Sequence, residues 1–451
     1  MAMFRSLPAC LRTFAAAMLV FSTACSGADA PLPDRSGAGA PAVEDGSRQP
    51  ASDSRDDADG SRPRAPAAAP SGPFFRAAAD RGELATFALD EAVLGTDGAI
   101  HIADGSGHAG TDPQPSGYHG GSFYNGGSFR YATAASPEWK SAAPFDTVTP
   151  SFEASTPPGT WIEVKLSARI DGTWTKDYSL GVWAERDGNV RRHSVEGQAD
   201  ESGDVATDTL ELTKPADALR MTAVLFSEGT ATPTLRAVSA IATMRTGPVA
   251  PADVDGAASA LGKVLAVPKR SQMIYPDGGE AWCSPTSTSM LLGYWADSLG
   301  ADGLRETPPQ AAGLCHDHVY RGTGNWPFNT AHAAALDGGR LHGAVTRLAS
   351  FAQVERLVGA GIPVAISIRF SKGELTRAPI SSTAGHLIVV RGFTADGDVV
   401  CNDPAFGSDA AVEVTYDRAE LTTVWQRSLG TTYLIWPAGT ALPVDPAGAF
   451  Y

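Results

Sequence analysis

Three residues in the C-terminal part of the chain have the side chains that catalysis through a thiol requires: Cys283, His386 and Asp403. The residues that follow Cys283, from Ser284 to Trp295, form a helical pattern. A cysteine at the start of a helix is stabilised as the reactive thiolate by the helix dipole and free backbone N–H groups. An isolated cysteine is more commonly a small buried apolar residue, so position alone does not identify a nucleophile.

His386 and Asp403 are spaced so that a hairpin can bring them together. His386 precedes a predicted strand at 387–393, and Asp403 follows the next predicted strand, 398–402. A hairpin centred on 394–395 would place the two residues nearly opposite each other, on one face. His386 can then donate one ring N–H to the carboxylate while its other nitrogen meets the thiol. Taken singly, His386 is equally a core histidine and Asp403 a turn former before proline.

The composition describes an acidic chain with room for more than one core. The 451 residues suit two domains and a tail, and 43% of them are hydrophobic. The formal net charge is −15, which argues against a nucleic-acid partner, because phosphate binding requires a basic surface. The same charge gives no attraction to anionic lipid.

The N-terminus has the features of an export signal. Arg5 and Arg12 precede a short apolar run at 13–21, and small residues lead to Cys25. The run is too short to span a bilayer, so we expect residues 1–25 to be a signal peptide of the lipoprotein type. Cys25 would then carry the lipid and hold the protein at the outer face of the cell membrane. The alternative is a plain secreted protein that is cleaved nearby.

Residues 26–72 have almost no large apolar side chains, which predicts a disordered linker. From 73 to 250 the pattern alternates with period two, most clearly at 161–170, and turn pairs interrupt it. This predicts an all-β sandwich. The aromatic, glycine-rich segment 117–131 is either a sugar- or peptide-contacting surface or a plug for one end of the sandwich.

The sequence pattern changes in 251–451, where we expect helices as well as strands. A helix from 285 and a second at 351–360 precede strands at 364–370, 387–393 and 398–402. Helix-first, strands-later order predicts an α+β domain. Of the five cysteines, Cys10 lies in the signal, so Cys283, Cys315 and Cys401 remain, an odd number for an exported protein. A Cys315–Cys401 disulfide is possible, but spacing alone does not establish it. His316 and His318 lack a third ligand for a metal.

Several motifs resemble the bacteriocin-processing (double-glycine leader) cysteine peptidases, and more closely their secreted single-chain relatives from actinobacteria. The resemblance covers roughly 260–440. The matching segments are Val267-Pro268, Ser271-Gln272, Trp282-Cys283-Ser284-Pro285-Thr286, Gly324-Asn325-Trp326-Pro327-Phe328-Asn329, Gly385-His386 and Asn402-Asp403-Pro404.

The resemblance implies a papain-like cysteine peptidase domain at 251–451, preceded by the sandwich at 73–250. It implies Cys283 as nucleophile, His386 as base, Asp403 as the residue that orients the histidine, and Gln272 as an oxyanion-hole donor. Asn402 competes with Asp403, since papain uses asparagine, but the Asp-Pro match favours Asp403. Candidate substrate-binding residues are Trp282, Asn325, Trp326 and Gly385. No metal or cofactor is implied, and the partner is a peptide or protein substrate, with possible cell-wall or glycan contact through the sandwich.

Two departures from the family limit this transfer. Gln272 lies 11 residues before Cys283, farther than the family usually shows. The chain also has no transmembrane or nucleotide-binding part, so the leader-peptide substrate is not carried over. Two alternatives therefore stay open: a cell-wall peptide amidase or acyltransferase that uses the same triad, and a non-catalytic surface protein that binds glycan or protein.

Overall fold

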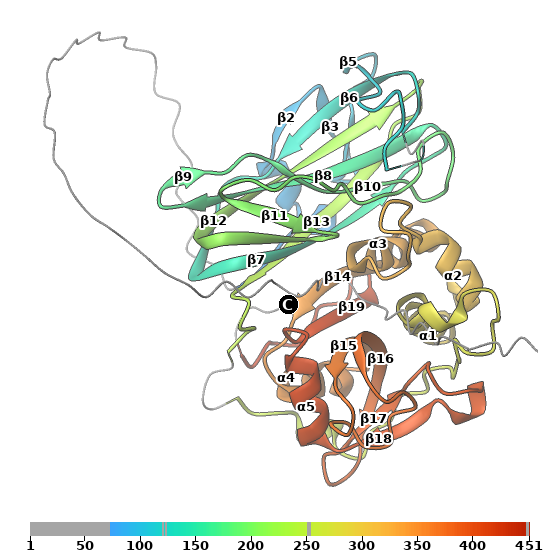
Figure 1. The fold of residues 1–451 in the computed structure, drawn as a ribbon. Coiled ribbons are helices and arrows are strands. Elements are labelled where there is room, and N and C mark those ends of the chain that lie inside the picture. The colour runs from blue at the N-terminus through green and yellow to red at the C-terminus, as the bar shows by residue number, and fades with distance from the viewer. Residues whose placement is uncertain (1–72, 120, 122–123, 250–253, 448–450) are drawn as a thin grey trace, which may run out of the picture.

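The computed structural model describes residues 73–119, 121, 124–249, 254–447 and 451, which form two domains packed together (Figure 1). The predicted signal peptide, the candidate lipidation residue Cys25 and the predicted linker 26–72 lie outside the described residues. Among the helices that are described, none is long and apolar enough to cross a membrane.

The N-terminal domain is built from thirteen strands. Their bounds are β1 Phe74–Ala78, β2 Ala88–Asp90, β3 Ala92–Leu94, β4 Ile100–Ile102, β5 His108–Thr111, β6 Ser128–Ala135, β7 Trp139–Ser155, β8 Thr160–Ile170, β9 Thr173–Trp174, β10 Tyr178–Trp183, β11 Gly203–Ala206, β12 Thr209–Ser227 and β13 Thr234–Thr243.

Strand β8 shows why this segment forms a sheet. Ile162, Val164 and Leu166 are fully buried, whereas Glu163 and Lys165 between them are only half-buried. This period of two places the apolar side chains on the core face of the sheet. β8 pairs with β10 on one side and with β12 on the other, so its buried face lies in the middle of the domain.

The predicted sandwich implies two separate sheets, and the observed strand pairing differs from this. Hydrogen bonds connect all thirteen strands in one network, because β7 and β12 are long enough to change neighbours along their length. β12 pairs with β7 from Leu210 to Leu219 and with β8 from Ala218 to Ser227. β7 then continues as the neighbour of β13. Sequence alternation locates buried faces but carries no information on which neighbour a long strand keeps.

The C-terminal domain mixes helices and strands. Its helices are α1 Cys283–Leu299, α2 Pro308–Cys315, α3 Trp326–Ala335, α4 Phe351–Gly359 and α5 Arg418–Gln426, and its strands are β14 Leu341–Arg347, β15 Val364–Phe370, β16 Thr383–Phe393, β17 Val399–Asn402, β18 Glu413–Tyr416 and β19 Thr431–Pro437.

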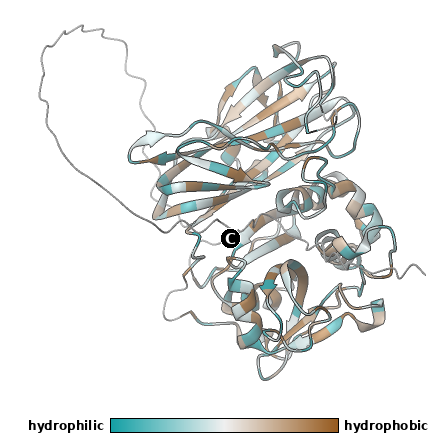
Figure 2. Cartoon of the chain, viewed as in Figure 1, coloured by the Kyte–Doolittle hydropathy of each residue, from teal (hydrophilic) through white to brown (hydrophobic). Residues whose placement is uncertain are grey.

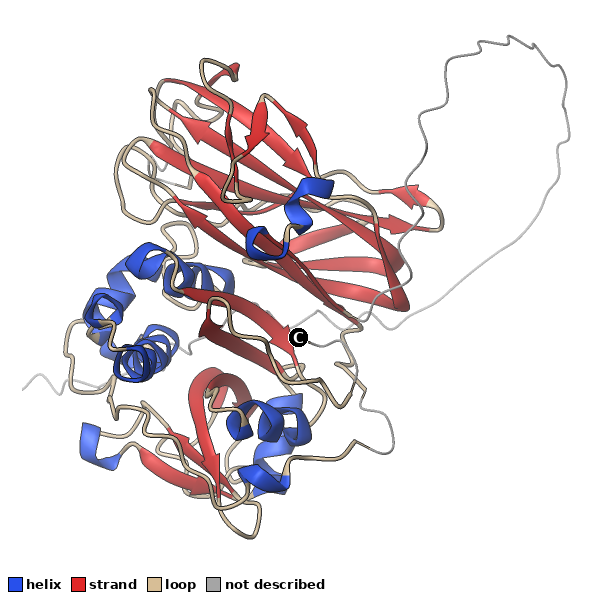
Figure 3. Cartoon of the chain, turned by 180° about the vertical axis from the view of Figure 1, so that it is seen from behind, coloured by secondary structure: helices blue, strands red, loops and turns tan. Residues whose placement is uncertain are grey.

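The six strands form an antiparallel sheet in the order β14-β19-β15-β16-β17-β18. Figures 1 and 3 show this sheet between α1–α3 on one side and α4 and α5 on the other. Apolar side chains from both helix groups and the sheet form one core, and Figure 2 shows the apolar residues concentrated along these elements.

The two domains meet along strands β7 and β14. Glu153 of β7 is buried and accepts hydrogen bonds from Arg76 (2.9 Å) and His342 (2.9 Å), while Ser151 accepts one from the backbone of Val345 (2.7 Å). The N-terminal domain therefore rests on the edge strand of the C-terminal sheet through buried polar contacts.

Candidate active site

His386 and Asp403 are in direct contact. The Nε2 atom of His386 lies 2.7 Å from Oδ1 of Asp403, and both side chains are buried, with the histidine 3% and the aspartate 1% exposed. A hydrogen bond to Nε2 leaves Nδ1 as the ring nitrogen that can exchange a proton with another group. This is the arrangement that an orienting carboxylate and a general base require.

The pairing register is not the one expected from sequence. Phe393 pairs with Val399, so the turn is centred near residue 396, later than expected. A β-bulge between Val390 and Gly392 moves the register back by only one residue, and Val389 therefore lies opposite Asn402. Asp403 continues that strand and reaches His386 diagonally. The shift is an even number of residues, and therefore the two side chains still share a face.

Three donors surround the Asp403 carboxylate. Besides His386, the hydroxyl of Tyr416 donates to Oδ2 at 2.7 Å and the backbone N–H of Ala405 donates to Oδ1 at 3.0 Å. Burial alone would raise the pKa of Asp403, but the charge and hydrogen bond of His386, with those of Tyr416 and Ala405, hold the pKa below its usual value. The carboxylate is therefore ionised across the physiological range.

Tyr416 was not identified by the sequence analysis. It ends β18, which pairs with β17 so that Tyr416 lies opposite Val399. Burial and the Asp403 charge raise the pKa of its hydroxyl, so it remains a donor. A sequence shows only a tyrosine at the end of a short strand, and its partner becomes evident only when that strand is placed next to β17.

Cys283 is fully buried and is the first residue of α1. The predicted helix start at 285 is two residues late: the N-cap is Trp282, and the Ser284 hydroxyl lies 2.7 Å from the Tyr433 hydroxyl.

Helix α1 is tied to the strand that carries His386. Ser287, one helical turn after Cys283, donates its hydroxyl to the carbonyl of Leu387 at 3.1 Å. Leu387 directly follows His386. The start of α1 and the catalytic candidate on β16 are thus held in the same part of the domain, although they are 103 positions apart in the sequence.

Gln272 is buried beside the loop that leads to Cys283. Its Nε2 donates to the carbonyls of Gly279 and Glu280, both at 2.9 Å, and its backbone N–H donates to Pro404 at 2.9 Å. Its Oε1 has no hydrogen-bond partner among the described residues. To donate to an oxyanion, the side-chain amide would have to give up its hydrogen bonds to these two carbonyls. The oxyanion-hole role therefore stays a prediction.

The long spacing between Gln272 and Cys283 is taken up by turns. Tyr275 bonds back to Gln272, Gly279 back to Tyr275, and Trp282 back to Gly279. The extra residues therefore fold into a compact loop and leave Gln272 beside the approach to α1.

The four candidate substrate-binding residues occupy different environments. Asn325 is fully buried; it caps α3 by accepting from Phe328 (3.1 Å) and donates to Asp317 (2.9 Å). This is a structural position without access to a substrate. Trp282 is half-buried, with its ring 6.0 Å from that of Tyr275.

Trp326 and Gly385 share the lining of one cavity of about 180 Å³ between the two domains. Gly385 precedes His386, so the cavity begins one residue from the catalytic candidate.

The other residues considered for chemistry are Asn402, Cys315 and Cys401. Asn402 donates to the carbonyl of Pro268 (3.1 Å) and accepts from Arg391 (3.3 Å), so Asp403 and not Asn402 contacts His386. Cys315 and Cys401 are free buried thiols and do not form a disulfide with each other. Burial raises the pKa of both thiols.

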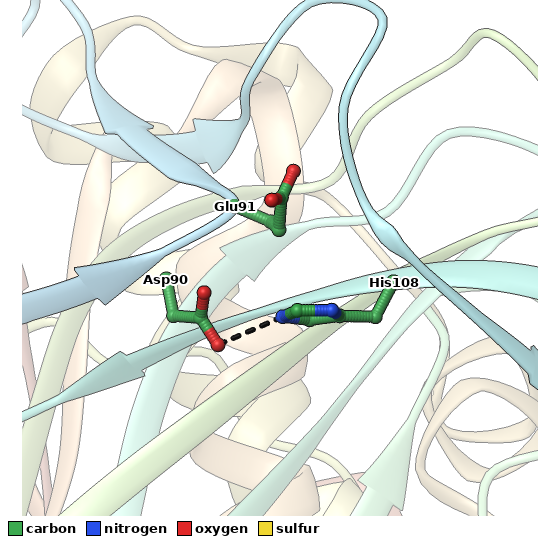
Figure 4. A group of neighbouring side chains, drawn as sticks. All are labelled: Asp90, Glu91 and His108. Carbon is green, nitrogen blue, oxygen red and sulfur yellow. Dashed lines mark hydrogen bonds and ion pairs between the residues drawn. The ribbon is translucent and has the colours of Figure 1, made fainter.

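One group among the described residues has the donors for a metal ion. Figure 4 shows Asp90, Glu91 and His108, whose ligand atoms lie within 4.8 Å of one another. Asp90 and His108 are exposed and already bonded to each other at 2.8 Å, an arrangement that occurs on protein surfaces without an ion. The group lies in the N-terminal domain, apart from the Cys283 site.

Aromatic side chains from the glycine-rich segment pack against the N-terminal domain. Tyr124 and Phe129 contact Trp161 at ring distances of 5.5 and 5.4 Å, and Phe226 stacks on the same ring. These contacts fit the packing interpretation of the segment; glycan contact stays a prediction.

Two family models match the chain. The model for the peptidase C39 N-terminal domain matches residues 75–243, and that for the peptidase C39 like family matches residues 264–433. A solved structure from Bacillus anthracis, described as a C39-like peptidase, is 18% identical with a TM-score of 0.26, and the match covers 40% of this chain and 99% of that chain. A search of curated proteins finds no match.

Proposed function

The chain is a relative of the peptidase C39 family, and from this premise we propose that it is a cysteine peptidase that hydrolyses peptide bonds through Cys283, His386 and Asp403. The observation that carries the assignment is the 2.7 Å contact between buried His386 and ionised Asp403. The link from α1 to Leu387 supports Cys283 as the partner of that pair.

The proposed reaction begins with reduced Cys283. Nδ1 of His386 takes the thiol proton, and the thiolate, stabilised at the start of α1, attacks the carbonyl carbon of the peptide bond. The imidazolium then protonates the leaving amine as the C–N bond breaks, which leaves an acyl-thioester on the sulfur. Water, deprotonated by His386, hydrolyses the thioester and returns the thiol. Asp403 stabilises the imidazolium and fixes its orientation.

The N–H of Cys283 is the proposed first donor to the oxyanion, and Gln272 the proposed second. One such donor typically contributes about 3 kcal/mol to the transition state. The contacts of Gln272 with Gly279 and Glu280 keep the amide close to the residues that precede Cys283, which supports this location.

Thiol reactivity tests the proposal. The reduced protein is treated with a stoichiometric alkylating agent near pH 6, where an ordinary thiol of pKa about 8.5 is mostly protonated. We expect fast labelling of Cys283, at least about tenfold slower in His386→Ala. Cys315 and Cys401 should stay unlabelled, because burial raises the pKa of both thiols and keeps them protonated. Labelling of Cys283 that is slow, or equally fast without His386, would contradict the peptidase assignment.

The substrate reaction separates hydrolysis from transfer. Incubation with peptides and an added amine should yield only the free acid if the chain is a hydrolase. An amide formed with the added amine would identify an acyltransferase instead.

We also propose that the protein is exported and anchored through Cys25. The apolar run at 13–21 and the small residues before Cys25 support this. Mass spectrometry of the mature N-terminus tests it: a diacylated Cys25 is expected, and an uncleaved N-terminus would rule it out.

A further inference from the structure

The cavity beside Gly385 has walls from both domains. The N-terminal domain contributes Thr147, Thr209, Glu211 and Arg245, and the C-terminal domain contributes Trp326, Arg347, Ser367, Arg369, Ala384, Gly385, Arg427, Ser428 and Leu429. Its volume of about 180 Å³ is below the roughly 300–1,000 Å³ of sites for whole small ligands. The cavity therefore has room for one side chain or one chain end of a larger substrate.

The cavity is lined by four arginines and one acid, Glu211. Two of the arginines have acidic neighbours outside the lining: Arg245 pairs with Asp146, and Arg427 pairs with Glu374. A fourth acid, Asp208, is buried next to the lining residue Thr209, accepts from the backbone of Trp326, and its charge acts on Arg347.

Arg347 is the lining arginine that has no described carboxylate in direct contact. It is 1% exposed, and within the described part of the chain it has no ion pair. Its two terminal nitrogens donate to threonine hydroxyls of the N-terminal domain, Thr243 at 2.7 Å and Thr149 at 3.0 Å. Its Nε is buried and has no hydrogen-bond partner among the described residues.

A buried guanidinium without a carboxylate in direct contact is unusual, because burying a charge is expensive unless an opposite charge compensates for it. Asp208 compensates only in part, since burial raises the pKa of its carboxyl to about 7. Neutral hydroxyl partners orient the group but do not neutralise it. An incoming carboxylate supplies both the missing charge and an acceptor, and arginine binds carboxylates more strongly than neutral acceptors.

We propose that this cavity binds one carboxylate of the substrate, so that the peptidase acts on peptides that place an acidic side chain or a free C-terminus beside His386. Arg347 is the specificity-determining residue, and the N-terminal domain positions it through Thr147, Thr149 and Thr243. The proposal rests on the proposed peptidase function for its biological use but not for its test.

Equilibrium binding to the full chain carrying Cys283→Ala tests the proposal without any need for a reactive thiol. Two pairs of probes are titrated by calorimetry. N-acetyl-glycyl-glutamate amide against its glutamine counterpart reports on a side-chain carboxylate. N-acetyl-diglycine free acid against its amide reports on a chain end.

We expect one acid to bind at least about tenfold more tightly than its amide, in keeping with the strength of a charge-assisted hydrogen bond. Arg347→Met should abolish that preference and leave amide binding unchanged. Arg377→Met is the matched control, since it removes the same charge from an exposed position outside the cavity, and it should keep the preference.

Where Arg347→Met fails to fold, judged by circular dichroism, Arg369→Gln at the half-buried wall of the cavity replaces it, and the preference should fall. Equal binding of acid and amide in both pairs, no measurable binding of either acid at millimolar concentration, or an equal loss in Arg377→Met would each overturn the proposal. If Cys283 is labelled slowly but the preference for the acid is preserved, the proposed peptidase function would be contradicted and the carboxylate site would stand.

Discussion

The Asp403 carboxylate accepts hydrogen bonds from three parts of the chain. The donors are His386 on β16, Tyr416 on β18 and the backbone N–H of Ala405, two residues after Asp403. Each donor stabilises the ionised carboxylate in a site that water does not reach. The consequence is that His386 has a fixed charged partner whatever the external pH within the physiological range, and its orientation depends on residues that never touch a substrate.

Tyr416→Phe should therefore weaken the site through Asp403. The change removes one hydrogen bond to a buried charge, which typically contributes about 1.5–3 kcal/mol, so the free energy of unfolding should fall by that order. Labelling of Cys283 should also slow and its pH profile should shift. Tyr294→Phe is the control, because Tyr294 donates to the neutral carbonyl of Gly361 and not to a buried carboxylate. A Tyr416→Phe profile that matches the native one would contradict the positioning role.

Asp208 should make stability fall as pH rises. Burial raises the pKa of its carboxyl to about 7, although Trp326 and Thr209 donate to it. Between about pH 4 and 7 the folded state holds a proton that the unfolded chain has released, so the free energy of unfolding decreases by up to about 1.4 kcal/mol per pH unit. Asp208→Asn does not titrate there. Urea unfolding measures the free energy of unfolding of both proteins at pH 4 and pH 8. From pH 4 to pH 8 the native protein should lose a few kcal/mol more than Asp208→Asn, and an equal change in both proteins would refute this.

At the scale of secondary structure, the sequence predicts those helices and strands whose pattern of apolar residues is set by the segment itself. The strand at 161–170 and the helix at 351–360 lie within a residue of β8 and α4, because both patterns are readable in a short window of sequence. Helix α3, strand β14 and the bulge in β16 could not be predicted. The form of α3 and β14 depends on contacts with the other domain. The bulge lies where Gly392 passes the backbone of Lys263, a residue of the same domain that is distant in sequence.

The packing of β14 against α3 gives a prediction of its own. A Cβ at Gly343 would lie 2.3 Å from the carbonyl oxygen of Thr330 in α3, a backbone atom that has no room to move. Gly343→Ala should lower the free energy of unfolding by about 1–3 kcal/mol. Gly313→Ala in α2 is the matched control: nothing lies within 4 Å of its Cβ, and helix propensity predicts a gain of up to about 1 kcal/mol. Thermal unfolding of both variants checks the contrast.

Across the whole molecule, the contact between His386 and Asp403 could be predicted from residue types and spacing, but the surroundings of the site could not. The cavity at Gly385 exists because strands β7 and β12 of the N-terminal domain lie over the C-terminal domain. No periodicity in either segment encodes that contact, since it joins residues about 200 positions apart, as between Thr147 and Arg347.

The domain interface should loosen in acid. Burial alone would raise the pKa of Glu153, but the hydrogen bond from His342 and the charge of Arg76 lower it. A carboxyl with a lowered pKa stabilises the fold above its unfolded pKa, about 4.3, and this contribution is lost as pH falls through the folded pKa. Glu153→Gln should thus be less stable than the native chain at pH 7, by about 3 kcal/mol for a broken buried pair.

The difference between Glu153→Gln and the native chain should shrink as the pH falls below 4. Differential scanning calorimetry across pH 3–7 measures it. A gap that widens in acid would show that Glu153 does not hold the interface as an ionised group.

The hydroxyls of Thr147, Thr149 and Thr243 that hold Arg347 have a consequence for how such a protein changes over generations. Under the proposed specificity, a mutation in the N-terminal domain would reshape the selectivity of a reaction whose reacting groups are all encoded downstream of that domain. Recombination that supplied the C-terminal half with a foreign partner would then keep Cys283, His386 and Asp403 and lose the hydroxyls that hold Arg347.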